Sequence, residues 1–179
     1  MGVVGSRGQP VAASGRGFAV GVLVCLACAS TLRLEDGRWR HGALGYSIDA
    51  LAPGWVPLEV DGVDLAFRGP GGATTSLSSR CHTPLAEPPV LARHLVIGLP
   101  DRSRLEARAV LVDGRPGWLQ RYEVTVDAST RQLTSVTTVV RECVIDFVLV
   151  EPGTAPGSAQ EFERWWGSFR WNVKPQVPS

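Results

Sequence analysis

The chain has 179 residues, of which 44% are hydrophobic and 20% are charged, and its formal net charge is +1. This length suits one globular domain and is too short for two comfortable ones. The near-neutral charge and the absence of a basic run argue against nucleic acid as a partner.

Residues 1–27 have the layout of a signal peptide. Arg7 and Arg16 are the only charged residues in this segment, and residues 18–27 are apolar or small. Charged residues return at Arg33, so the apolar run is shorter than the roughly 20 residues that a membrane-spanning helix needs. We therefore predict an export leader that ends at residue 27, and no permanent membrane span.

Cys25 and Cys28 have the spacing of a redox pair, which raises a second interpretation of this segment. A redox-active pair needs one thiol with a lowered pKa at the start of a helix. Only an apolar run precedes these cysteines, so we favour a targeting role over a redox role.

The residues Leu26-Ala27-Cys28 resemble the lipobox of bacterial lipoproteins. The resemblance implies cleavage before Cys28 and acylation of that cysteine, for example by palmitate. Because Ala29 rather than aspartate follows, it also implies an outer-membrane anchor that faces the periplasm. The same residues fit a small-x-small site for ordinary signal peptidase, which would release a soluble periplasmic or secreted protein. We favour the lipoprotein, in which several acyl chains would hold Cys28 firmly to the bilayer.

After the leader, residues 28–44 are mixed and polar, and we interpret them as a tether between anchor and domain. From Gly45 onward the pattern changes to short extended runs with turn residues between them. The Asp61-Gly62 dipeptide suits a tight hairpin turn, and the run from Gly69 to Gly72 breaks the chain again. The first predicted strands are residues 46–51, 55–60, 63–68 and 73–81.

The second half repeats this pattern. Asp113-Gly114 marks another hairpin, and the β-branched run from Val136 to Val140 favours a half-buried pleated surface. The predicted strands here are residues 104–112, 118–127, 132–141 and 143–150, which would complete an antiparallel meander.

Two segments have helical spacing instead. Residues 87–99 place Leu91, His94, Leu95 and Gly98 along one face. Residues 158–169 contain an aromatic stripe at i, i+3, i+4 and i+7, which favours core packing over a ligand site. The stripe consists of Phe162, Trp165, Trp166 and Phe169.

These elements predict a single α+β domain over residues 45–171, with an antiparallel sheet of about six to seven strands packed by two helices, and a frayed tail over residues 172–179. The order of elements resembles the PsbP-like α/β/α sandwich. The likeness depends on Tyr46-Ser47-Ile48-Asp49, Pro53-Gly54-Trp55, the strand around Cys143-Val144-Ile145-Asp146-Phe147 and a terminal helix that ends in Ser168-Phe169. It implies a fold, and a binding or assembly role without shared catalytic residues.

Cys81 and Cys143 are the cysteines of the predicted domain. In an oxidising compartment, two such cysteines favour a disulfide, which we predict here. The alternative is a pair of buried free thiols that behave as small apolar side chains.

We predict no catalytic, metal or cofactor site. A zinc site built around Cys81 and His82 lacks further ligands at a recognised spacing, and neighbouring residues of a strand point to opposite faces. Asp146 alternates with apolar residues, so we expect it to face solvent. The resulting hypothesis is a noncatalytic, lipid-anchored envelope protein that binds or scaffolds another envelope component. The alternative is a small periplasmic hydrolase or thiol enzyme that uses Cys81, His82 or His94.

Overall fold

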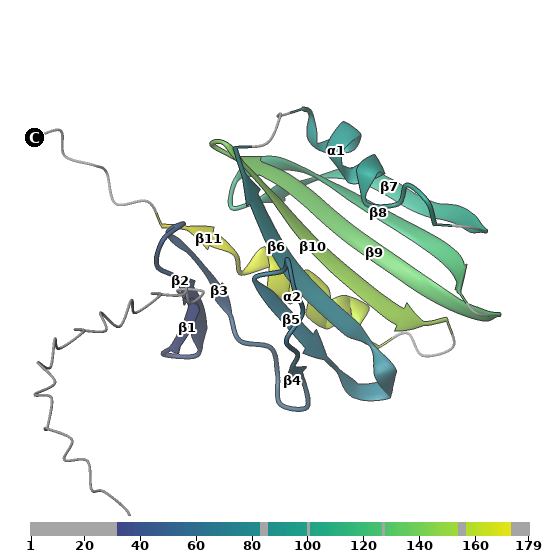
Figure 1. Ribbon diagram of the computed structural model, residues 1–179, viewed down its shortest axis with the longest axis horizontal. Helices are drawn as coiled ribbons and strands as arrows, with labels where there is room; N and C mark the ends of the chain where they lie inside the picture. The colour runs from purple at the N-terminus through teal and green to yellow at the C-terminus, as the bar shows by residue number, and fades with distance from the viewer. Residues whose placement is uncertain (1–31, 83–85, 100, 127, 154–156, 173–179) are drawn as a thin grey trace, which may run out of the picture.

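The computed structural model describes residues 32–82, 86–99, 101–126, 128–153 and 157–172. The predicted leader, Cys28 and residues 173–179 lie outside them. The larger of two sheets has seven antiparallel strands in the order β4-β5-β6-β10-β9-β8-β7 (Figure 1). β6 and β10 are neighbours although three strands separate them in the chain, so the sheet consists of two antiparallel meanders, β4-β5-β6 and β7-β8-β9-β10, that meet at this pair. The strands are β4 (Val56–Pro57), β5 (Leu65–Arg68), β6 (Thr74–Cys81), β7 (Arg102–Val112), β8 (Arg115–Val126), β9 (Ser129–Val140) and β10 (Cys143–Pro152).

A second sheet has the order β1-β2-β3-β11. Two of its strands lie in residues 28–44, so the expectation of a tether is wrong from Leu32 onward. Asp36 and Gly37 join these two strands with φ values of 50° and 73°, a turn whose twist suits an antiparallel hairpin. The same Asp-Gly signal in the sequence would have predicted this hairpin. The strands are β1 (Leu32–Glu35), β2 (Arg38–His41), β3 (Tyr46–Asp49) and β11 (Arg170–Trp171).

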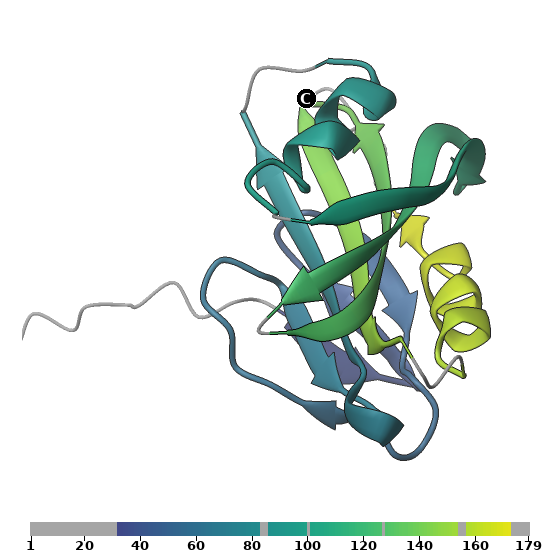
Figure 2. The ribbon, with the colours of Figure 1, turned by 90° about the vertical axis from the view of Figure 1, so that its right-hand side faces the viewer.

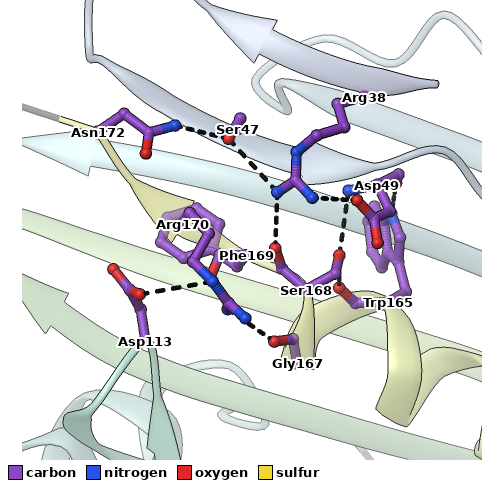
Figure 3. A network of polar contacts seen from close by, with 10 residues as sticks. All are labelled: Arg38, Ser47, Asp49, Asp113, Trp165, Gly167, Ser168, Phe169, Arg170 and Asn172. Carbon is purple, nitrogen blue, oxygen red and sulfur yellow. Dashed lines mark hydrogen bonds and ion pairs between the residues drawn. The ribbon is translucent and has the colours of Figure 1, made fainter. Parts of the chain in front are cut away.

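Arg38 attaches the hairpin to the rest of the domain (Figure 3). Its guanidinium forms an ion pair with Asp49 and donates a hydrogen bond of 2.8 Å to the carbonyl oxygen of Ser168, which follows helix α2 (Ala159–Gly167). The Ser168 hydroxyl accepts a hydrogen bond of 3.0 Å from the backbone N–H of Asp49. The hairpin therefore joins the domain through charge-assisted hydrogen bonds in addition to Leu32 and Trp39, which pack against the main core.

The chain end near β11 is also held in place. The backbone N–H of Asn172 donates a 2.7 Å hydrogen bond to the carbonyl oxygen of Gly45. Its side-chain amide donates another of 2.7 Å to the hydroxyl of Ser47. The predicted frayed tail is therefore wrong for Asn172, which belongs to the domain.

Helices α1 (Pro88–His94) and α2 cover opposite faces of the large sheet (Figure 2). Alternation along β8 shows this arrangement. Leu119 belongs to the main core with α2, whereas Tyr122 joins a smaller core beside α1, and the Gln120 amide donates a 2.6 Å hydrogen bond to the carbonyl oxygen of Ala92 in α1. The two-helix α+β architecture is thus confirmed, with two sheets instead of one.

The core role of the predicted aromatic stripe is confirmed, because all four of its rings belong to the main core, although helix α2 ends at Gly167 and Phe169 follows it. Phe147 of β10 meets Trp165 edge to face at a centroid distance of 6.1 Å and Phe169 at 5.4 Å. Edge-to-face contacts of this kind add stabilisation beyond the burial of apolar area.

The turns between strands agree with the sequence in one case and differ in another. Asp113 and Gly114 form the predicted two-residue turn between Val112 and Arg115. The turn predicted at Asp61-Gly62 is longer, because β4 and β5 pair only at Val56–Pro57 and the chain from residue 58 to residue 64 connects them.

Candidate functional site

The structure contains the predicted disulfide between Cys81 and Cys143. The two residues face each other in register, at the end of β6 and the beginning of β10. The bridge closes a sequence separation of 62 residues. Because both sulfurs are covalently paired, neither can serve as a free nucleophile or as a thiolate metal ligand.

The histidines of the enzyme alternative lie away from any reactive thiol. His82 has 84% of its side chain exposed, and its Nδ1 lies 3.3 Å from an Oε2 of Glu142. His94 is exposed at the end of α1, and in the described part of the chain no hydrogen bond connects it with Cys81 or His82. These residues are therefore not assembled into a nucleophile and an oriented base.

Asp146 is buried, so the expectation that it faces solvent is wrong. It is 1% exposed, accepts a 2.6 Å hydrogen bond from the hydroxyl of Thr137, and lies 2.6 Å from a guanidinium nitrogen of Arg80. Burial raises the pKa of the Asp146 carboxyl, and its two partners act against this rise. Each carboxylate oxygen has a protein partner, so the group links three adjacent strands, and its burial keeps it out of reach of a substrate.

Glu151 is a second buried acid, which the sequence analysis did not single out. It is 2% exposed, and its Oε2 has no hydrogen-bond partner among the described residues. Burial raises its pKa, while a backbone hydrogen bond from Ser158 and the charge of Arg121 lower it. A carboxylate directly after the apolar run from Val148 to Val150 was the available signal.

The face of α1 that packs on the sheet differs from the predicted one. Pro88, Ala92 and Val96 are buried, while His94 and Gly98 are exposed. Ala92 is small enough for the helix backbone to approach Gln120 closely, and this contact sets the rotation of the helix. The exposed side of α1 is therefore richer in basic residues than the sequence pattern indicated.

A groove of about 480 Å³ lies between α1 and the beginning of β7. We call it the α1–β7 groove. It combines apolar and basic side chains, an arrangement suited to binding rather than to acid–base catalysis. Its lining residues are Val90, Arg93, His94, Val96, Ile97, Arg102, Arg104 and Tyr122.

The described residues include neither a metal cluster nor a membrane-spanning helix. They contain no cluster of three His, Cys, Asp or Glu residues placed to hold a metal ion. Within the same ranges, neither helix has the length and hydropathy required to cross a bilayer.

No family model and no curated protein matches this chain. Solved structures do resemble it. The cyanobacterial PsbP protein CyanoP from Synechocystis is 20% identical, with a TM-score of 0.59 over 88% of this chain and 98% of its own. LpqN, described as involved in cell envelope biogenesis of Mycobacterium tuberculosis, is 15% identical, with a TM-score of 0.56 over 73% of this chain and 86% of its own. A protein from Bacteroides thetaiotaomicron is 13% identical, with a TM-score of 0.54 over 73% of this chain and 46% of its own. The chain therefore has a PsbP-like fold, as its sequence resemblance implied.

Proposed function

We propose that this protein is exported and lipid-anchored through Cys28, and that it has a noncatalytic binding or scaffolding role on the periplasmic side of the outer membrane. The disulfide between Cys81 and Cys143 is the observation that carries the proposal. Such bonds persist in oxidising compartments and are rare in the cytosol. The predicted leader over residues 1–27 provides a second reason for export.

The chemistry of the described residues supports a binding role over catalysis. Cys81 is covalently paired, and both oxygens of the Asp146 carboxylate are occupied by protein partners. LpqN, which shares the fold, is described as involved in cell envelope biogenesis, and on this basis we propose an envelope location for this chain. Fold alone does not determine function, so the location requires a direct test.

The start of β1 adds a geometric consequence to the anchor. Only residues 29–31 separate Cys28 from Leu32, the first residue of β1. At about 3.5 Å per extended residue, this interval spans at most about 14 Å. An acylated Cys28 would therefore hold the β1–β2 hairpin close to the bilayer surface.

The test is intact-mass spectrometry under nonreducing conditions on protein from fractionated cells that express the full chain. We expect membrane-associated protein that begins at an acylated Cys28 and retains its disulfide. Cys28→Ser should abolish acylation and membrane association, whereas Cys25→Ser, in the discarded leader, is the matched control and should keep both. A cleaved but unlipidated product would remove the anchor, and full-length cytosolic protein with titratable thiols would overturn export.

A further inference from the structure

The charges around the α1–β7 groove are not compensated. None of its eight described lining residues is acidic, and three of them are arginines. Arg102 donates hydrogen bonds of 2.7 and 2.9 Å to the carbonyl oxygens of Val96 and Leu99, so it closes the end of the α1 segment. Among the described residues, Arg93 and Arg104 form no ion pair with a carboxylate. Two guanidinium groups therefore remain available to an acidic partner.

On the opposite face of β7, which is turned toward α2, arginines lie close to carboxylates. Arg108 lies 2.7 Å from a carboxylate oxygen of Glu106 and 3.7 Å from one of Glu163 on α2. Arg121 of β8 lies 3.4 Å from the other oxygen of Glu106. Arg108 and Arg121 thus have carboxylate partners within the chain, whereas Arg93 and Arg104 in the groove have none among the described residues.

β7 also provides backbone groups for a partner. It has 11 residues and is an edge strand of the large sheet, with a neighbour only on the β8 side. A bulge interrupts the pairing between Arg104 and Glu106, and the segment from Glu106 to Val112 is regular. Unpaired N–H and C=O groups along such an edge can receive an additional strand.

Exposed apolar side chains accompany these charges. Ile97 in the groove is 69% exposed, and Leu111 near the end of β7 is 68% exposed. A partner that covered this surface would bury apolar area and neutralise arginines at the same time, and this combination is typical of protein interfaces.

We propose that the α1–β7 groove and the edge of β7 bind an extended acidic segment of a partner protein, which adds a strand along Glu106–Val112 and places its carboxylates against Arg93 and Arg104. A second copy of β7 fits less well, because it carries three arginines and one glutamate and would add positive charge. This inference deepens the proposed binding role and rests on it only for the compartment of the partner.

The test uses the protein purified from whichever cell fraction contains it, so failure of the proposed anchor does not affect the outcome. The probe is a short, capped peptide of alternating Asp and Val, and the control peptide has Lys in place of Asp. We expect the acidic peptide alone to bind in calorimetry. It should also slow amide hydrogen exchange along Glu106–Val112, as a new strand requires.

Charge reversal locates the site. Arg93→Glu combined with Arg104→Glu should weaken binding by roughly tenfold or more. Arg68→Glu combined with Arg164→Glu is the matched control, because it also reverses two exposed arginines, neither of which lines the groove. Both variants should melt at the same temperature as the wild type.

Several results would overturn the proposal. Equal binding of the two peptides, or undiminished binding by the double variant, would show that the groove is not an acidic-peptide site. Binding without protection of β7 amides would refute strand addition. Association with anionic vesicles in place of the peptide, or self-association through β7, would assign the surface to a membrane or to a second copy.

Discussion

Removing the disulfide is the perturbation whose size the structure predicts most directly. The bridge joins residues 62 positions apart in the chain that are already opposite each other on paired strands. Its loss therefore mainly increases the entropy of the unfolded chain. The chain-entropy model gives about 4 kcal/mol for a loop of this length, a large part of the 5–15 kcal/mol that is typical of a domain.

The assay is thermal and urea unfolding of the oxidised wild type, the reduced wild type and the Cys81→Ala, Cys143→Ala double variant. For a domain of about 140 residues, a loss of about 4 kcal/mol corresponds to a decrease in Tm of roughly 10–15 °C. Reduction changes no side-chain volume, so it separates the effect of the bond from the small void that alanine leaves at Cys143, which is 7% exposed.

The single variants provide the internal check. Each of them breaks the same bond, so each should lose nearly as much free energy of unfolding as the double variant. Additive effects of the single substitutions, or equal Tm values for the oxidised and reduced proteins, would refute the reasoning.

Two further predictions concern individual side chains. Arg38→Ala should lower the free energy of unfolding by about 1–2 kcal/mol, because it removes charge-assisted hydrogen bonds that are partly solvated. Amide hydrogen exchange should then accelerate in the β1–β2 hairpin but not in β9. An equal effect of Arg33→Ala would contradict this prediction. Glu151 has a raised folded pKa, so it holds its proton more tightly in the folded state and stability decreases as the pH rises above its ordinary value of 4.5. Glu151→Gln should remove this decrease in urea titrations between about pH 4 and pH 8, and an unchanged pH dependence would show that the carboxyl does not titrate abnormally.

Only part of the candidate site could be predicted from the sequence. Cys81 and Cys143 stood out because Cys25 lies in the predicted leader and Cys28 directly follows it, and pairing follows from the compartment that the predicted leader implies. Arg93 and Arg104 did not stand out, because ten residues of chain lie between them and only the packing of α1 against β8 brings them to one groove. Charged residues that are far apart in a near-neutral sequence form a recognisable surface only in the folded protein.

Local patterns determined much of the fold. The aromatic face of α2 and the Asp113-Gly114 turn follow from periodicity and from backbone preference, both of which act over a few residues. Tertiary structure decided the rest. Alternation places Asp146 on the face opposite Phe147, but whether that face meets water depends on the layers that cover it. The pairing of β6 with β10, the burial of Asp146 and the recruitment of polar β1 and β2 all depend on contacts between distant segments, whose energies no local window of the sequence contains.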